Sequence, residues 1–324
     1  MARAKVDLFV RHPLLSFAKA SERLTRQARR TNTFRSFRSR FHIPLPPVER
    51  PIFIVGTIRS GSTVLAQCLG DHPRILYDRS ELTAEWCDFA GIEIARSFNR
   101  LLHCPPYTAA DATDACCQRV RSGFAEFMVK KGGTRNTRFF NKNPHLWNKL
   151  PFLRVIFPDA KLIVTSRDIR STVASIKGMW IRGKERTGLQ YYVPQDHARC
   201  WGVISSTTSE ALDTSRIFPG GNVTALAEYW LYAYEMIENT IEGFTSPVLV
   251  RHREFVVAPR ETLAKIYESV KLPSWNYPLP VELDLSRNER WREILTLEEQ
   301  RELEGFIESN RSRIERLKYA DTTL

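Results

Sequence analysis

Residues 51–69, PIFIVGTIRSGSTVLAQCL, place an apolar run, a turn rich in Gly, Ser and Thr, and a helical pattern in direct succession. This order indicates a buried strand, a loop and a helix whose first amides face the loop. Gly56, Gly61 and the following Ser62 keep the spacing of a phosphate-binding P-loop, but Ser62 stands where the ATP-binding form carries a lysine. Arg59 supplies a positive charge from inside the loop instead. The segment predicts a phosphate site that lacks the lysine used with ATP and magnesium.

Two later segments repeat the theme of basic residues next to a buried strand. Residues 160–176, AKLIVTSRDIRSTVASI, read as a strand, a turn and a helix, with Arg167 at the strand's end and Ser175 on the helix. Residues 141–159, NKNPHLWNKLPFLRVIFPD, carry Lys142 and lead directly into that strand. Taken singly, these residues fit a surface ion pair and a solvent-facing lysine equally well.

Together the three segments resemble the sulfotransferases that use 3′-phosphoadenosine 5′-phosphosulfate (PAPS), in particular the tyrosylprotein and the bacterial glycolipid, trehalose-type enzymes. The Arg-Ser-Gly-Ser-Thr loop, the Asn-Lys-x-Pro pattern and the later Arg and Ser carry the resemblance, which covers roughly residues 51–275. It implies an α/β fold, a P-loop-like three-layer sandwich with a mostly parallel central sheet and helical lid insertions. The function it implies is transfer of a sulfuryl group from PAPS to a hydroxyl acceptor.

The resemblance also implies a donor site. Arg167 and Ser175 match the family residues that hold the 3′-phosphate of PAPS. Arg59 matches the residue that neutralises the 5′-phosphate, and its neighbours surround that phosphate: Ser60, Gly61, Ser62 and Thr63. Arg287 and Arg290 follow in a late basic loop, and they fit closure over the 3′-phosphate and solvated charges equally well.

The catalytic base has three candidates. Glu81 lies about where the related enzymes carry a catalytic glutamate, and Lys142 matches the lysine that contacts the sulfuryl group. Glu85 stays open, because the match to the tyrosylprotein enzymes needs a shift of one residue. His145 stays open because another branch of the family uses a histidine shortly after its lysine. We expect Glu81 to be the base and His145 to be a buried structural residue.

The N-terminal region differs in charge from the rest of the chain. Residues 1–50 carry twelve Lys and Arg against three acids, and therefore most of the chain's net charge of +12. We expect a basic arm and Pro-rich linker over 1–50, before a sulfotransferase domain over 51–324. Residues 1–45 suit peripheral contact with an anionic membrane and a solvated tail about equally well. A nucleic-acid partner is not expected, because no binding module is recognisable.

The cysteine pattern predicts a reducing compartment, and the hydropathy pattern predicts a chain without a membrane span. The six cysteines show neither metal-ligand spacing nor the rhythm of a disulfide framework, so we expect free thiols and no metal. The chain shows no membrane-length apolar stretch and no signal peptide. A cytoplasmic protein, peripheral on the inner membrane face if the arm binds lipid, is therefore expected.

The coarse architecture alternates strands and helices. Strands are expected near residues 52–56, 74–77, 137–141, 161–166 and 247–251. Insertions at 82–135 and 181–225 are expected to build the acceptor pocket and lid, and Trp230 and Tyr234 to be core residues. The favoured acceptor is a hydroxyl on a glycan or glycolipid, with small phenolic molecules and tyrosine peptides as alternatives. The rival functions are a P-loop-type small-molecule kinase and a noncatalytic, membrane-associated anion-binding protein.

Overall fold

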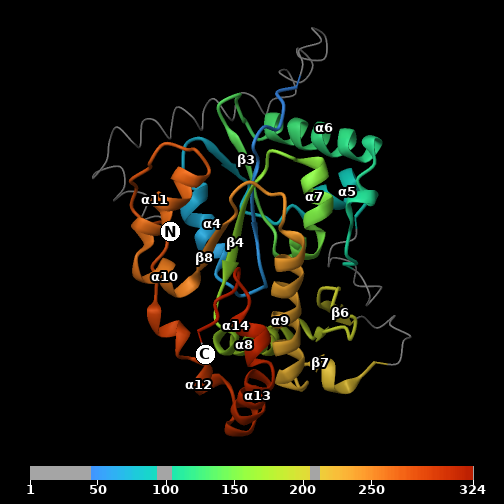
Figure 1. The fold of residues 1–324 in the computed structure, drawn as a ribbon, viewed down its shortest axis with the longest axis vertical. Helices are drawn as coiled ribbons and strands as arrows, with labels where there is room; N and C mark the ends of the chain where they lie inside the picture. Colours follow the sequence, from blue (N-terminus) through green and yellow to red (C-terminus); the bar gives the residue numbers. More distant parts are fainter. Residues whose placement is uncertain (1–44, 93–103, 205–211, 324) are drawn as a thin grey trace.

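The computed structural model describes residues 45–92, 104–204 and 212–323. At its centre lies a parallel sheet of five strands in the order β2-β3-β1-β4-β8 (Figure 1). The strands are β1 (Ile52–Val55), β2 (Ile75–Tyr77), β3 (Arg138–Lys142), β4 (Lys161–Ser166) and β8 (Val248–Arg251). Every strand expected from the sequence is present within one residue of its expected bounds. The α/β class with a mostly parallel central sheet is confirmed.

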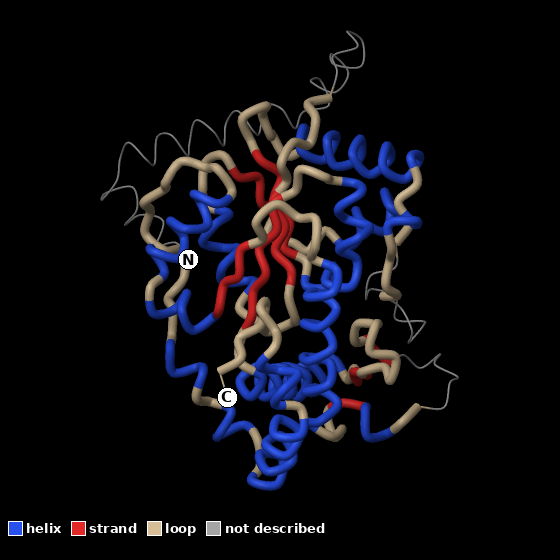
Figure 2. The backbone as a smooth tube through the Cα atoms, viewed as in Figure 1, coloured by secondary structure: helices blue, strands red, loops and turns tan. Residues whose placement is uncertain are grey.

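Helices cover both faces of this sheet (Figure 2). Successive side chains of a strand point to opposite faces, so Phe53 and Val55 of β1 enter one apolar cluster while Ile52 and Ile54 enter the other. One cluster includes residues of α6 (Asp114–Lys130), α7 (Leu150–Ile156), α8 (Ile169–Thr187) and α9 (Val223–Thr240), and the other includes residues of α4 (Ser62–Gly70) and α11 (Pro259–Ser269). Burial on both faces explains why the strands read as continuous apolar runs.

The first insertion contributes aromatic side chains to this core. It contains α5 (Thr83–Ala90), η1 (Ala109–Asp111) and α6. Phe124 of α6 packs against Trp86 of α5 and Phe139 of β3, with ring centroids 4.8 and 4.7 Å apart. Such tilted and edge-to-face contacts add to the stabilisation from burial. The described part of this insertion is therefore packed onto the sheet.

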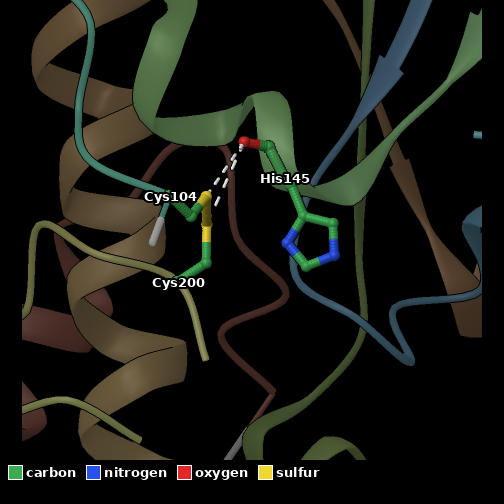
Figure 3. A group of neighbouring side chains, drawn as sticks. All are labelled: Cys104, His145 and Cys200. Carbon is green, nitrogen blue, oxygen red and sulfur yellow. Dashed lines mark hydrogen bonds between the residues drawn. A yellow bond between two sulfur atoms is a disulfide. The ribbon is translucent and has the colours of Figure 1, made fainter. Parts of the chain in front are cut away.

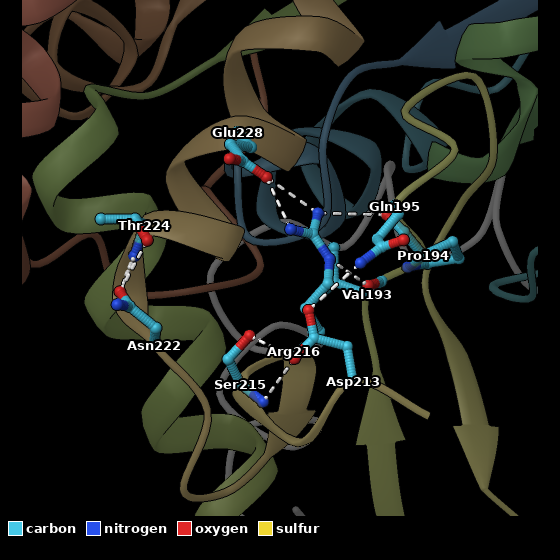
Figure 4. A network of polar contacts seen from close by, with 9 residues as sticks. All are labelled: Val193, Pro194, Gln195, Asp213, Ser215, Arg216, Asn222, Thr224 and Glu228. Atoms are coloured by element: carbon cyan, nitrogen blue, oxygen red, sulfur yellow. Dashed lines mark hydrogen bonds and ion pairs between the residues drawn. The ribbon is translucent and has the colours of Figure 1, made fainter. Parts of the chain in front are cut away.

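The second insertion forms a small antiparallel sheet held against α9. Its strands are β5 (Gln190–Tyr192), β6 (Gly202–Ile204) and β7 (Ile217–Phe218), with η3 (Thr214–Arg216) before β7. Arg216 anchors the sheet, because its guanidinium contacts Glu228 of α9 at 2.8 Å and donates from Nε to the Val193 carbonyl (Figure 4). A buried guanidinium satisfied at several nitrogens fixes the position of this segment.

The C-terminal third supplies a helical end to the domain. Residues 285–288 form a short 3₁₀ turn next to the sheet, and α13 packs against α9. The remaining elements are η2 (Pro144–Lys149), α10 (His252–Val257), η4 (Leu285–Asn288), α12 (Trp291–Ile294), α13 (Leu297–Ser309) and α14 (Arg311–Glu315). Within the described ranges, the helices are too short or too polar to cross a bilayer. The proposed membrane contact of residues 1–45 falls almost wholly outside the described residues.

One expectation about the cysteines is wrong. Cys104 and Cys200 form a disulfide across 96 positions of sequence, while Cys68, Cys87, Cys116 and Cys117 are free. The two partners come from different insertions, so their sequence spacing carried no sign of the bond. His145 also lies beside this pair, a juxtaposition that the spacing did not predict.

Gly56 follows β1 directly and lies in close contact with Thr165 of β4. Its φ of +141° belongs to a region that only glycine adopts readily, and a Cβ at this position would lie 2.3 Å from the Thr165 carbonyl oxygen. The backbone conformation and the close approach therefore both require glycine. The contact sets the path of the chain as it leaves β1.

We expect Gly56→Ala to destabilise the protein strongly, by roughly 3 kcal/mol or more, because strain and a backbone clash act together. Gly188→Ala is the matched control, since Gly188 also has a positive φ but open space around its Cα, and should cost only about 1 kcal/mol. Urea denaturation measures both. Equal losses in the two variants would mean that the contact with Thr165 contributes nothing.

Candidate active site

The loop after β1 is fastened to the end of β4. Ser60 Oγ donates to the Thr57 carbonyl at 2.7 Å and lies 2.8 Å from Thr165 Oγ1. The sequence placed the Ser60 hydroxyl beside a phosphate, but in the structure Ser60 is buried and its hydroxyl bonds to the protein. Ser62 and Thr63 are the first two residues of helix α4. Gly61 is the N-cap residue and has no side chain to cap the helix, so amides of the first turn stay available to an anion.

Arg59 connects this loop to α8. Its Nε donates to Ser175 Oγ at 3.0 Å, which joins residues 116 positions apart. The pKa of the Arg59 guanidinium is lowered, first by burial and then by the positive charges of Arg182 and Arg287. Arg59 and Ser175, which the resemblance assigns to different phosphates of the donor, are therefore in contact with each other. An anion bound here would relieve the repulsion between the positive charges of the arginines.

Arg167 lies at the end of β4 and meets the late basic loop. Its Nε donates to Asn288 Oδ1 at 3.0 Å, and its Nη2 donates to the Arg287 carbonyl. Burial above all lowers the pKa of Arg167 to about 10, and the charges of Arg59 and Arg287 lower it further against the opposing effect of Asp168. Of the two loop arginines left open by the sequence, Arg287 contacts Arg167, through its main-chain carbonyl.

Arg290 and Arg287 have similar side-chain environments but different main-chain contacts. Both side chains are more than half exposed and pair with Asp284, Arg290 at 3.7 Å and Arg287 at 3.3 Å, while the Arg287 carbonyl accepts from Arg167. An exposed pair of this kind contributes little to stability and leaves the guanidinium at the surface. The structure thus favours Arg287 over Arg290 as a neighbour of Arg167.

Two aromatic residues support this end of β4 from behind. Trp230 Nε1 donates to the Arg167 carbonyl at 3.0 Å, and the Tyr234 hydroxyl donates to the Thr165 carbonyl at 2.8 Å. Both side chains are fully buried, which confirms them as core residues. They position the backbone from which Arg167 projects.

Glu81 and Lys142 form the other half of the site. Lys142 Nζ lies 2.7 Å from Glu81 Oε1, and the lysine side chain is 8% exposed while that of the glutamate is 37% exposed. The asymmetry places the carboxylate toward solvent and the ammonium toward the protein. The pair brings together two residues that the sequence predicted separately.

Two asparagines on either side of Lys142 hold Glu81 by its backbone. Asn141 Nδ2 and Asn143 Nδ2 both donate to the Glu81 carbonyl, at 3.1 and 2.9 Å. Trp86 Nε1 in turn donates to Asn141 Oδ1 at 2.9 Å. The tripeptide Asn-Lys-Asn at the end of β3 therefore fixes both the backbone and the side chain of the glutamate, a role for the asparagines that sequence reasoning missed.

The other two candidate bases are placed differently. Glu85 lies in the first turn of α5. His145 is buried with its ring against Trp201, and burial lowers its pKa to about 4, so the imidazole is neutral at pH 7. The expectation that His145 is a buried residue is confirmed.

His252 and Asn288 were also missed by sequence reasoning. His252 packs so closely on Gly61 that a Cβ there would lie 2.4 Å from its ring, and its Nδ1 lies 3.1 Å from Asn288 Oδ1. Asn288 therefore bridges His252 and Arg167. A histidine directly after a strand in a parallel sheet was a usable signal, because ligands bind at the carboxyl ends of such strands.

The Sulfotransferase family matches residues 51–277, from the start of β1 to beyond α11. The chain belongs to the sulfotransferase family. Among curated relatives, protein-tyrosine sulfotransferase A of Caenorhabditis elegans is 29% identical over 133 residues, covering 39% of this chain and 32% of the relative. Nodulation protein NoeE of Sinorhizobium fredii (strain NBRC 101917 / NGR234) is 26% identical over 150 residues, covering 42% of this chain and 32% of the relative. The matches thus span about a third of each relative.

Solved structures of bacterial sulfotransferases resemble this chain more distantly. The enzyme from Alicyclobacillus acidocaldarius is 15% identical, with a TM-score of 0.49 over 85% of this chain and 98% of that chain. Sulfotransferase STF9 from Mycobacterium avium is 16% identical, with a TM-score of 0.43 over 82% of this chain and 77% of that chain.

Acid should destabilise this sulfotransferase through its buried histidines. Burial lowers the pKa of both His145 and His252 from 6.5 to about 4, so between these values the unfolded chain binds protons that the folded chain does not. Stability is therefore full above about pH 6.5 and is lost as the pH falls toward 4. We expect the urea midpoint to fall over this range, and less steeply in His145→Gln. If the urea midpoint fell equally steeply with pH in the wild type and in His145→Gln, protonation of His145 would not contribute to the acid destabilisation.

Proposed function

We propose that this sulfotransferase moves the sulfuryl group of PAPS to a hydroxyl acceptor by in-line transfer, with Glu81 as the base. The observation that carries the proposal is the Glu81–Lys142 pair, in a family member that also gathers Arg59 and Ser175 at the N-terminus of α4. A base, a cation and an anion site are the parts that transfer of a charged group requires.

The donor end is assigned to the arginine cluster. Arg59 and the amides of Gly61 to Thr63 bind the 5′-phosphate, while Arg167 and Ser175 bind the 3′-phosphate. The lowered pKa values of the two arginines support this assignment, because the repulsion between neighbouring positive charges is relieved by a bound anion. Ser62 in place of the P-loop lysine supports PAPS over ATP with magnesium.

The catalytic end is assigned to Glu81 and Lys142. The half-exposed carboxylate accepts the proton of the acceptor hydroxyl as that oxygen attacks the sulfur. The buried ammonium stabilises charge that develops on the oxygen between sulfur and the departing 5′-phosphate. Before the substrates bind, each group neutralises the other, which keeps both in place.

The acceptor is proposed to be a carbohydrate or lipid-linked hydroxyl. The relatives include a protein-tyrosine sulfotransferase and a nodulation protein, so the comparisons do not select one class of hydroxyl acceptor. Peripheral membrane contact through residues 1–45, the domain boundary at residue 50 and a cytoplasmic location stay predictions.

Arg167→Ala should weaken binding of 3′-phosphoadenosine 5′-phosphate about ten- to a hundredfold, since a charge-assisted contact contributes roughly 1.5 to 3 kcal/mol. Adenosine 5′-phosphosulfate lacks the 3′-phosphate, so its binding should hardly change. Calorimetry or ligand-induced thermal stabilisation measures both.

Arg170→Ala is the matched control for this variant, because Arg170 lies three positions on and its guanidinium pairs with Glu304. Equal losses for the two nucleotides would contradict the 3′-phosphate assignment. ATP with Mg²⁺ stabilising the wild-type protein as well as 3′-phosphoadenosine 5′-phosphate would contradict the donor itself.

Glu81→Gln should slow single-turnover transfer about a hundredfold or more while donor affinity stays nearly unchanged, because the amide keeps the size but cannot accept the proton. Lys142→Ala should also reduce turnover strongly. The rate is followed as the mass gain of an acceptor found by screening glycans and glycolipids.

Glu85→Gln tests the second candidate base and should keep a nearly normal rate, and a loss as large as that of Glu81→Gln would contradict the assignment to Glu81. His145→Asn should have a smaller effect than Glu81→Gln. An inactive His145→Asn protein combined with a nearly normal Glu81→Gln protein would move the base to the histidine.

A further inference from the structure

Two cysteines from different insertions meet beneath the turn that follows Lys142. Cys104 and Cys200 are both fully buried and joined by a disulfide. Figure 3 shows the two sulfurs facing the main-chain oxygen of His145, which lies 3.9 Å from Cys104 Sγ and 4.0 Å from Cys200 Sγ. The bond therefore links both insertions at a single point against η2.

The same three segments are joined by hydrogen bonds. Asn148 Nδ2 donates to the Cys104 carbonyl at 3.0 Å and to the Ala198 carbonyl at 2.7 Å. Lys149 Nζ donates to Asn148 Oδ1 at 2.7 Å and lies 3.2 Å from Cys104 Sγ. Residues of η2 thus contact Cys104 itself and the segment two residues before Cys200.

This assembly is continuous with the proposed catalytic turn. β3 ends at Lys142, and η2 begins at Pro144. Asn143 connects them, because its Nδ2 donates to the Glu81 carbonyl and its Oδ1 accepts from the His145 amide. A displacement of η2 is therefore passed to both Glu81 and Lys142.

We propose that Cys104–Cys200 is a redox-formed clamp that positions the Glu81–Lys142 pair and leaves the donor-binding loop independent. The inference that it affects turnover rests on the proposed function. The proposed donor-binding residues bond to one another and to the late loop, since Arg59 Nε donates to Ser175 Oγ and Arg167 Nε donates to Asn288 Oδ1. Neither of these two bonds involves a residue of η2. Reduction should accordingly lower transfer without lowering donor affinity.

Lys149 sets which sulfur reacts first when the clamp forms. Burial lowers the pKa of the Lys149 ammonium to about 7, so its amine can take the Cys104 thiol proton. The Cys104 thiolate then attacks a low-molecular-weight disulfide RSSR, giving a mixed disulfide and one RS⁻. Cys200 next attacks the Cys104 sulfur and loses its proton as the second RS⁻ leaves, so two thiols are oxidised and one RSSR is reduced to two RSH.

A metal centre is the competing interpretation of this group. Cys104, Cys200 and His145 offer ligand atoms within 4.8 Å of one another, and His145 Nδ1 is buried without a partner among the described residues. Two thiolates and an imidazole suit Zn²⁺. The two sulfurs are bonded to each other in the structure, which favours the disulfide.

The bond itself is tested on the full chain by blocking thiols at lysis and mapping peptides without reduction. We expect a Cys104–Cys200 cross-link, with Cys68, Cys87, Cys116 and Cys117 alkylated in denaturant. Six alkylated cysteines, another pairing, or one zinc per chain in native mass spectrometry would overturn the proposal. This readout does not depend on enzyme activity.

The effect on transfer is tested by titrating with dithiothreitol and by Cys104→Ser and Cys200→Ser. Reduced wild type and both variants should lose about tenfold or more in turnover, since small displacements of catalytic groups are costly. Affinity for 3′-phosphoadenosine 5′-phosphate should stay within about twofold, which also shows that the variants fold. The variants should no longer respond to reductant.

Cys87→Ser is the matched control, as a half-buried free cysteine on α5, and should keep normal turnover and the response to reductant. Unchanged turnover in cross-linked and reduced wild type would overturn the positioning role. Failure of wild type to bind 3′-phosphoadenosine 5′-phosphate would contradict the proposed function and leave the peptide map as the test of the bond.

Discussion

The contact between the β1 loop and the end of β4 organises this molecule. Gly56 lets the loop approach the Thr165 carbonyl, and Ser60 and Thr165 join their hydroxyls across the gap. Neighbouring parallel strands end at the same edge of the sheet, so both loops open there. The proposed phosphate-binding residues Arg59 and Arg167 can be neighbours only because these two strands pair.

The cationic cluster at this edge is costly without an anion. Arg167 is buried and Arg59 lies nearby in the loop, and the positive charge of Arg287 acts on both while Asp168 offsets part of it. Hydrogen bonds from Arg167 to Asn288 and to the Arg287 carbonyl hold the guanidinium in place. Such an arrangement lowers stability and fits the proposed phosphate site, since groups with shifted pKa values are common at functional sites.

The proposed catalytic pair depends on a different part of the sheet. Lys142 ends β3, and the asparagines beside it bind the Glu81 backbone. The same turn continues into η2, where the Cys104–Cys200 bond joins the two insertions. The proposed donor side of the site is thus supported by β1 and β4, and the proposed acceptor side by β3 and η2, which both contact β1.

The sequence by itself determined the parallel sheet and its strands, because buried strands such as Lys161–Ser166 are apolar runs bounded by turn residues. It also determined the residues of the two proposed phosphate loops and the candidates Glu81 and Lys142, because these follow strands or lie in short motifs. Local spacing could not decide between Glu81, Glu85 and His145, because their distances from Lys142 depend on how the first insertion packs.

Only the tertiary structure brought together residues that are far apart in the chain. It paired Arg59 with Ser175, placed Asn288 between Arg167 and His252, and joined Cys104 to Cys200. It also showed His145 to be buried against Trp201. Such long-range pairs leave no periodicity in the sequence, because they depend on the packing of whole elements and are therefore decided only in the folded chain.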